Sequence, residues 1–450
     1  MNALSPYLES VRRLRTIRVE GRVVALRGMA LHVEDLPAPV GSLVRVGSAH
    51  LGEVVGFEGS RAIVMMLVQT GGVQTGDAVC ALQVTQTVGV GARLLGRVLD
   101  GLGRPIDGRG PIREAVPRLI DPEPISALRR RRITEPLPTG VRVIDLMTTL
   151  GRGQRMGVFA GPGVGKSTLL GRAARRTRAD VNVIGLIGER GREVRDFIDG
   201  VLGREGLERS VVVVATGDES PLMRIRAAHV ACAAAEQFRD DGLDVLLTMD
   251  SVTRFAHAQR QVGLSVGEPP ATKGYTPSVF AAMARLLERA GAVEPESGGA
   301  RGGSITGLYT ILVEGDEMNE PISDAARGIL DGHIVLSRAL ARKGHYPAVD
   351  VLDSISRVAD DVCDGAHVAA RRQFTRLLSA YRQVEELVQI GAYAKGSSPE
   401  ADAAIAFKSR LDEILRQDAT DDESFDAARA RMIRLAVEAG AALQSGPRRT

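Results

Sequence analysis

One glycine-rich stretch, "VFAGPGVGKSTLLG" at residues 158–171, constrains the fold of this chain more than any other feature. The apolar run that ends at Ala160 predicts the end of a buried strand, and the residues from Ser167 onward predict the start of a helix. Three glycines lie in the turn between them: Gly161, Gly163 and Gly165. Glycine allows a loop whose backbone N–H groups converge on an anion, and the helix N-terminus adds partial positive charge there. The stretch therefore predicts a P-loop within an α/β sheet.

Two side chains extend this loop into a nucleotide site. Lys166 would reach the β- and γ-phosphates of ATP, and the hydroxyl of Ser167 would bind Mg²⁺. The motif usually begins with glycine, whereas this chain has Ala160, which fits provided that the residue is still extended. A glycine-rich turn that binds nothing is the alternative. The predicted phosphate-binding residues are Ala160, Gly161, Pro162, Gly163, Val164, Gly165, Lys166, Ser167 and Thr168.

Composition limits the classes of protein to which the chain can belong. A length of 450 residues allows two or three domains, and 44% apolar with 25% charged residues is typical of a globular chain. The net charge of +3, the lack of Trp and an aromatic content of 3% give no support to a nucleic-acid binder. No apolar run approaches the roughly 20 residues of a membrane span, no signal peptide is recognised, and the few scattered cysteines suit reduced thiols. We therefore expect a cytoplasmic protein.

Three regions follow one another along the sequence. Short β-rich runs separated by Gly, Pro or Asp, from about Thr16 to Gln86, predict a small antiparallel β-barrel. Strands then alternate with helical stretches, which predicts a parallel α/β core, and after Ala366 the pattern becomes helical and charged. The first 18 residues have the pattern of a short amphipathic helix. The chain is thus expected to be multidomain α/β, with an N-terminal segment and β-barrel at 1–88, a P-loop core at 89–365 and a C-terminal helical domain at 366–450.

A carboxylate lies where another predicted strand ends, because Asp250 closes the apolar run "VLLTMD". The carboxyl ends of parallel strands face the nucleotide crevice, so Asp250 can hold Mg²⁺ through water. A strand-end cap without any ligand is the alternative. A P-loop in the same sheet favours the metal.

The run "GLIGERGREVRDF" places Glu189 and Arg190 directly after a further predicted strand. Glu189 can polarise an attacking water, and Arg190 can neutralise phosphate charge or pair with an acid. Several more charged residues follow at once, so an ion network on the surface is the alternative.

Three residues elsewhere have roles that spacing alone leaves open. Arg357, on the Ser-rich turn predicted at "DSISRV", would stabilise a transferred phosphoryl group in its own site or a neighbour's, or else form a structural salt bridge. Tyr346, in "GHYPAVD", would stack on adenine or fill the core. Tyr275 lies on a Gly- and Pro-rich loop that is either a moving element or a simple turn.

Longer strings resemble a known family. "GEPPATKGYTPSVFAAMARLLERAG", "LGRVLDGLGRPIDG" and "VEGDEMNEPISDAARGILDGHIVLSR" look like the ATPases of type III protein export, and the resemblance spans roughly residues 20–440. The flagellum-specific export ATPase looks nearest, the injectisome ATPase is its near twin, and both resemble the catalytic β subunit of rotary ATP synthases. The resemblance implies a RecA-like, F1-type ATPase core that hydrolyses Mg-ATP.

The resemblance also implies roles for single residues. Glu189 would be the catalytic carboxylate that orients water, Arg357 a finger that reaches into the adjacent subunit's site, and Tyr346 the residue that lies against adenine. Lys166, Glu189, Asp250 and Arg357 all occur in this one chain. A single polypeptide that contains all four residues of the ATPase site suits a homohexamer with six like sites.

Partners and location follow from the same resemblance. It implies a dimeric stator-like regulator at the N-terminal segment, a coiled-coil stalk in the centre of the ring, and chaperone–substrate complexes at the C-terminal helices. It also implies peripheral association with the export gate at the inner membrane. Hydrolysis would then drive chaperone release, unfolding or entry of the export substrates.

Two other classes share parts of this pattern. A rotary ATP synthase or vacuolar-type subunit has the same core but needs a partner chain in its ring. An RNA translocase similar to the terminator Rho carries a string like "DSVTRFAHA", yet its barrel would need exposed aromatic residues, and here Phe57 is the only aromatic residue of the barrel region after Tyr7. The "RRRR" run at 129–132 is either a solvated linker or a nucleic-acid contact. No specific nucleic acid is expected.

Overall fold

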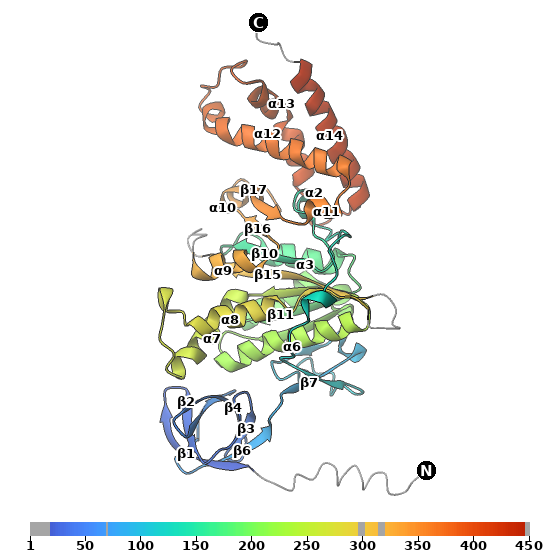
Figure 1. The fold of residues 1–450 in the computed structure, drawn as a ribbon. Helices are drawn as coiled ribbons and strands as arrows, with labels where there is room; N and C mark the ends of the chain where they lie inside the picture. Colours follow the sequence, from blue (N-terminus) through green and yellow to red (C-terminus); the bar gives the residue numbers. More distant parts are fainter. Residues whose placement is uncertain (1–18, 69–70, 296–301, 314–319, 446–450) are drawn as a thin grey trace, which may run out of the picture.

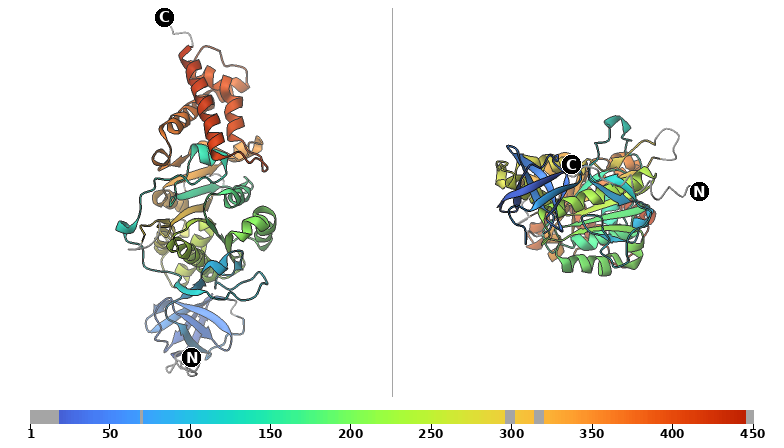
Figure 2. Two further views of the ribbon diagram at one scale, coloured as in Figure 1. Left: turned by 90° about the vertical axis from the view of Figure 1, so that its right-hand side faces the viewer. Right: turned by 90° about the horizontal axis from the view of Figure 1, so that it is seen from below.

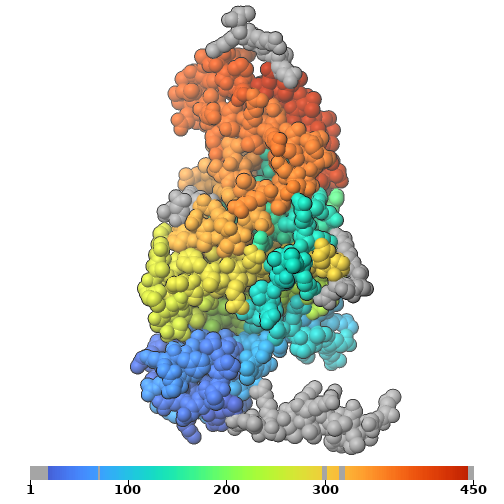
Figure 3. All heavy atoms as spheres, viewed as in Figure 1, coloured from blue at the N-terminus to red at the C-terminus, as the bar shows by residue number. Residues whose placement is uncertain are grey.

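Three regions are stacked along one long axis in the computed structural model, which describes residues 19–68, 71–295, 302–313 and 320–445 (Figure 1). The N-terminal region forms one end, the sheet with its helices forms the middle, and the C-terminal helices form the other end. The left view of Figure 2 and the space-filling view in Figure 3 show the same order. The amphipathic helix expected in the first 18 residues lies outside the described part of the chain.

The N-terminal region is a closed antiparallel barrel with the strand order β1-β2-β5-β4-β3-β6, which confirms the predicted barrel. Its interior holds aliphatic side chains such as Val33, Val44 and Val64, because alternate residues of a strand point to the same side. Its strands are β1 Glu20–Arg27, β2 Ala30–Glu34, β3 Leu43–Val46, β4 His50–Glu58, β5 Arg61–Met66 and β6 Ala78–Gln83.

The middle region is built on a nine-stranded sheet with the order β17-β16-β10-β15-β13-β11-β12-β8, and β14 is paired with β15. The inner strands are parallel, as predicted, whereas β17 and β14 run antiparallel to their neighbours. The strands are β8 Val98–Leu99, β10 Arg155–Ala160, β11 Val181–Ile187, β12 Ser210–Ala215, β13 Asp244–Asp250, β14 Gly291–Ala292, β15 Ser304–Leu312, β16 Gly332–Leu336 and β17 Val349–Ser356.

Helices cover both faces of this sheet, so the central strands are buried on both sides. Val183 and Leu247 pack on one face with α6, α7 and α8, whereas Ile184 and Leu246 pack on the other face with α3. This is why these strands read as continuous apolar runs. The helices of the region are α2 Arg142–Met147, α3 Lys166–Arg176, α4 Gly191–Asp196, α5 Gly203–Glu208, α6 Pro221–Asp240, α7 Val252–Ser265, α8 Pro277–Leu287, α9 Pro321–Ile329, α10 Arg338–Arg342 and α11 Ala359–Val362, with short single-turn pieces at η1 Ala92–Leu94, η2 Ala127–Arg129, η3 Phe197–Leu202 and η4 Thr272–Gly274.

The C-terminal region consists of α12 Gly365–Gln389, α13 Pro399–Leu415 and α14 Phe425–Ser445. These helices share one apolar cluster with α2 and with one face of the sheet, since Phe374 and Met432 belong to the same cluster as Val158. A separate pair, β7 Thr87–Val90 and β9 Val116–Leu119, links the barrel to the sheet. The exact domain borders at 88 and 365 stay predictions.

None of the helices in the described ranges combines the length and the apolar composition that crossing a bilayer requires. Cys80, Cys232 and Cys363 are not joined by disulfide bonds.

Candidate nucleotide site

The glycine-rich stretch forms the expected turn between β10 and α3. Ala160 is the last residue of β10 and is therefore still extended, as its place in the motif requires. Gly163 and Gly165 have φ angles of 77° and 89°, a backbone region that residues with a Cβ rarely adopt. The helix begins at Lys166, one residue earlier than predicted. The turn thus places the start of α3 at the carboxyl edge of the sheet.

Three charged side chains meet at this edge. Lys166 Nζ lies 2.6 Å from Asp250 Oδ1 and 3.5 Å from Glu189 Oε1. The two carboxylates come together because β11 and β13 are neighbouring parallel strands, with Leu186 paired to Asp250. These three residues were predicted separately from sequence, and the structure brings them into one cluster.

The cluster is largely shielded from water, and this shifts its protonation. Burial, and next the negative charge of Asp250, raise the pKa of Glu189 to about 7, against the opposing effect of Lys166. Burial alone would lower the pKa of Lys166, yet the two carboxylates together hold it above its ordinary value. The amine therefore stays charged at neutral pH, while Glu189 titrates near neutrality.

A threonine that sequence reasoning missed also belongs to the cluster. The Thr310 hydroxyl, on the buried strand β15, donates to Asp250 Oδ1 at 2.7 Å. A polar residue inside the apolar run "GLYTILV" was the available signal. The side chain of Arg254, on α7, lies beside Gly188, the residue before Glu189, because a Cβ on Gly188 would lie 2.7 Å from the Cβ of Arg254.

The oxygen groups at this edge suit a magnesium ion that arrives with the nucleotide. Ser167 lies in the first turn of α3, beside Lys166, and Asp250 supplies a carboxylate. Mg²⁺ prefers oxygen ligands and usually keeps several waters, so one hydroxyl, one carboxylate and substrate phosphates are enough. In the described ranges, no group of three or more His, Cys, Asp or Glu side chains forms a metal cage of its own.

Tyr346 lies next to the phosphate loop. A Cβ on Gly165 would lie 3.6 Å from two ring carbons of Tyr346, and 46% of this residue is exposed. The ring is therefore a half-exposed wall beside the loop and does not fill the core. The neighbouring His345 is buried and accepts a hydrogen bond from Arg416, as expected for an ordinary structural histidine.

The other two predicted arginines do not join the cluster. Arg190 projects into solvent and forms an ion pair with Glu193 at 3.2 Å. Of the two roles predicted for Arg190, neutralising phosphate charge or pairing with an acid, the structure shows the pairing with an acid. Arg357 is exposed and donates to the Arg327 carbonyl at 3.4 Å. Arg357 lies in a turn, as predicted, but the serines before it belong to the edge strand β17, which ends at Ser356.

Strand direction determines which edge of the sheet Arg357 occupies. Because β17 is antiparallel to β16, Ser356 pairs with Gly332, the first residue of β16. The P-loop follows Ala160, which pairs with Leu336, the last residue of β16. At about 3.3 Å per residue, the two ends of such a strand are some 13–16 Å apart. Arg357 therefore lies at the edge opposite its own P-loop.

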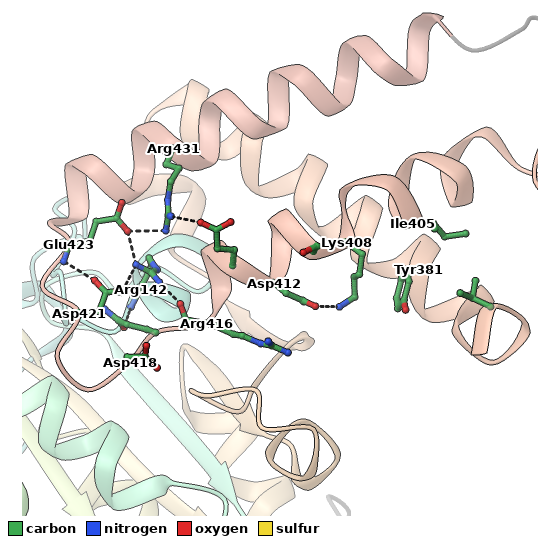
Figure 4. Close-up of a pocket in the computed structure, with 14 residues that line it drawn as sticks. Arg142, Tyr381, Ile405, Lys408, Asp412, Arg416, Asp418, Asp421, Glu423 and Arg431 are labelled. Carbon is green, nitrogen blue, oxygen red and sulfur yellow. Dashed lines mark hydrogen bonds and ion pairs between the residues drawn. The ribbon is translucent and has the colours of Figure 1, made fainter. Parts of the chain in front are cut away.

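The remaining residues that sequence analysis singled out have structural contacts. Arg130 of the arginine run donates to the carbonyls of Ala290 at 2.9 Å and Glu288 at 2.6 Å, which ties this linker to the sheet. Tyr275 is buried, and its hydroxyl lies 3.0 Å from His257 Nε2. A cavity of about 1120 Å³ lies between α2 and the C-terminal helices. Both acidic and basic side chains line its wall (Figure 4).

A P-loop at the carboxyl edge of a parallel sheet, with a lysine between two carboxylates, defines a P-loop nucleotide hydrolase. Comparison with known proteins makes this class more specific. Residues 140–356 match the model of the ATP synthase alpha/beta family, nucleotide-binding domain, and residues 363–434 match the T3SS EscN ATPase C-terminal domain.

Individual relatives agree with these models over nearly the whole chain. The chain is 49% identical to the flagellum-specific ATP synthase of Pseudomonas aeruginosa, with 96% of each chain covered, and 49% identical to the type 3 secretion system ATPase of Xanthomonas euvesicatoria, with 92% of this chain and 94% of that one covered. The chain therefore belongs to the family of flagellum-specific and type III secretion ATPases, and it is an ATPase.

Solved structures show the same architecture. The assembled ATPase EscN from the type III secretion system of enteropathogenic E. coli is 40% identical, with a TM-score of 0.87, and the match covers 92% of this chain and all of that one. EscN in complex with its central stalk EscO is similar at a TM-score of 0.84 and 39% identity, with the same coverage. The barrel, the P-loop core and the helical C-terminal region are thus those of this family.

Proposed function

We propose that this ATPase hydrolyses Mg-ATP in a homohexameric ring in which each site is completed by Arg357 of the adjacent subunit. The position of Arg357 carries this proposal. Its own P-loop lies at the opposite edge of the sheet, and Lys166, Glu189 and Asp250 meet at that opposite edge. An exposed arginine at an edge strand is suitably placed to reach a neighbouring copy.

The chemistry needs positioning and charge neutralisation more than covalent catalysis. The loop N–H groups and Lys166 would hold the phosphates, Tyr346 would lie against the adenine, and ionised Glu189 would orient the attacking water. Mg²⁺, bound by Ser167 and through water by Asp250, would neutralise the β- and γ-phosphate oxygens. A finger supplied by another subunit contributes on the order of 10³–10⁵ in rate in related phosphoryl transfers.

Mixed rings test this assignment. We expect Glu189→Gln and Arg357→Ala chains each to be nearly inactive alone. Mixed one to one, they should recover up to about a quarter of the wild-type rate, because random assembly pairs an intact Glu189 with an intact neighbouring Arg357 at that fraction of interfaces. Arg204→Ala, at a solvent-exposed residue paired with Glu208, is the matched control and should be active without mixing. Mixtures that stay inactive, although mass spectrometry shows mixed rings, would contradict a finger in trans.

We further propose that hydrolysis serves type III protein export, most directly flagellar export, by releasing chaperones from substrates, unfolding them or aiding their entry into the export gate. The flagellar relative from Pseudomonas aeruginosa and the type 3 secretion relative from Xanthomonas euvesicatoria each share 49% identity with this chain, so the choice of system rests on the sequence resemblance. Deletion of the gene in the source organism separates the two. Loss of flagellar filaments supports flagellar export, and loss of effector secretion with intact filaments contradicts it.

The partners are proposed on the same basis. Because the relative EscN has been solved with a central stalk, we infer a stalk protein in the centre of this ring. We also infer a dimeric regulator at the N-terminal segment, chaperone–substrate complexes at α12–α14, and a cytoplasmic location beside the inner-membrane export gate. Affinity capture with the full chain, with and without residues 1–18, tests whether the regulator depends on that segment.

A further inference from the structure

The segment between α13 and α14, residues 416–424, is bound tightly to the ATPase core, and we call it the connector. It belongs to the C-terminal region by sequence, yet its polar partners come from α2, from α3 and from the strand-to-strand segment that carries Tyr346. It also borders the large cavity described above, where Asp418, Asp421 and Glu423 line the wall (Figure 4). The connector therefore joins the helical region to the nucleotide site.

Arg172 makes the most direct of these connections. It lies on α3, the helix that begins with the P-loop lysine, and it is only 8% exposed. Its guanidinium donates to the connector carbonyls of Asp418 at 2.9 Å and Ala419 at 3.2 Å, and also to the Asp421 carbonyl. Its Nε donates to the Gly140 carbonyl at 2.7 Å, before α2. One buried side chain thus holds the connector against the P-loop helix.

Arg142, on α2, holds the same segment from a second side. Its Nη1 donates to Asp421 at 2.7 Å and to Glu423 at 2.6 Å, and Figure 4 shows this side chain pointing into the bend of the connector. Its backbone N–H donates to the Gln417 side-chain oxygen at 2.9 Å. Arg142 and Arg172 are buried, so their guanidinium groups would be left unsatisfied if the connector moved away, and the arrangement resists displacement.

The connector in turn holds the residue beside the phosphate loop. The backbone N–H of Gln417 donates to the Tyr346 carbonyl at 2.9 Å. The Tyr346 ring lies against Gly165, the residue before Lys166 at the start of α3. The contacts therefore connect the P-loop to itself through the C-terminal region. Arg172 of α3 holds the connector, the connector holds Tyr346, and Tyr346 lies against the P-loop.

We propose that Arg172 is a positioning residue for the nucleotide: it holds the connector so that Tyr346 stands as the wall of the base pocket, and it thereby sets the affinity for the base while leaving the phosphate site intact. This inference rests on the proposed contact of Tyr346 with adenine. It assigns to a side chain of the P-loop helix a role that is exerted through the C-terminal region and not by contact with the phosphates.

Comparison of a nucleotide with a base-free ligand tests the proposal. We expect Arg172→Met to weaken Mg-ATP binding about tenfold, measured by calorimetry on the full chain, and to leave Mg-tripolyphosphate binding within twofold of the wild type. Arg172→Lys should restore part of the ATP affinity. Arg175→Met is the matched control, because Arg175 lies on the same helix but packs against α5 at Gly206.

A fluorescent probe can be placed at position 346, because the chain contains no tryptophan of its own. In the Tyr346→Trp chain, the emission of the single indole reports the base pocket. Adding Arg172→Met should shift this emission before any nucleotide is present, and a merely structural role for Arg172 elsewhere would not move it. Gln417→Leu, which removes the acceptor for the Arg142 N–H, should give the same shift if Arg172→Met chains fail to fold.

The outcomes separate the possible failures. Equal weakening of ATP and tripolyphosphate by Arg172→Met, or an unchanged indole emission in both the Arg172→Met and Gln417→Leu chains, overturns the role of Arg172. A failure of the proposed function appears in other samples: wild-type chains that bind no tripolyphosphate, or a Tyr346→Ala chain that binds ATP normally, would show that the P-loop or Tyr346 assignment is itself wrong.

Discussion

At the scale of single residues, the role proposed for Glu189 depends on its protonation. Only the ionised carboxylate can orient water as a hydrogen-bond acceptor, and its pKa is raised to about 7 in the folded chain. We therefore expect kcat/KM for ATP to rise about tenfold between pH 6 and pH 8, since kcat/KM reports the ionisation of the free enzyme. Steady-state rates across this range measure the effect. Glu189→Gln should lose this limb of the profile, and a flat wild-type profile would contradict the assignment.

The same raised pKa has a consequence for stability. Between the ordinary pKa of 4.5 and about 7, the folded chain keeps a proton on Glu189 that the unfolded chain releases. The contribution of this group to the free energy of unfolding is therefore full below pH 4.5 and is lost as the pH rises through 7. Chemical denaturation at pH 6 and pH 8 should show that Glu189→Gln gains stability relative to the wild type at the higher pH.

Thr310 provides a second prediction at this scale. Thr310→Val keeps the shape of the side chain but removes the hydroxyl that donates to Asp250. Hydrogen bonds to charged groups contribute roughly 1.5–3 kcal/mol, so we expect a loss of this size in the free energy of unfolding and a higher Mg²⁺ concentration for half-maximal ATPase rate. Thr248→Val is the matched control, because the buried hydroxyl of Thr248 has no hydrogen-bond partner among the described residues. Equal effects of the two substitutions would argue against a special role for Thr310.

At the scale of elements, sequence predicted what local pattern determines. The P-loop, the strands before Glu189 and Asp250, the barrel and the helical C-terminal region all follow from apolar runs, glycines and periodicity. The antiparallel edge strand before Arg357 was misread, because its serines resemble a turn and pairing partners are invisible in one sequence. The hydrogen bonds from Arg172 to the connector could not be predicted from the sequence either, because donor and acceptor are at least 246 residues apart in the chain.

The start of α12 allows a test of how far the helical region supports the whole chain. Asp364 caps this helix, accepting from the His367 N–H at 2.8 Å, and also pairs with Arg429 of α14. We expect Asp364→Ala to lower the free energy of unfolding by about 1–2 kcal/mol, measured by denaturant titration, because such caps contribute about that amount. Asp364→Asn retains a capping side chain and should lose less. A loss in the alanine variant no larger than in the asparagine variant would show that the cap contributes little.

At the scale of the whole molecule, the finger proposed for Arg357 would make assembly a condition for activity, because Arg357 lies at the edge of the sheet opposite its own P-loop. An isolated chain has Lys166, Glu189 and Asp250 in place but lacks the finger, so we expect its rate to be lower by on the order of 10³ than that of the ring. The ATPase rate per chain should therefore rise with protein concentration and level off where sedimentation shows complete rings. Arg357→Ala should assemble over the same range of concentration without this rise, which separates the finger from a contact that only holds the ring together. A wild-type rate per chain that stays constant while sedimentation shows dissociation into single chains would mean that each chain carries a complete site.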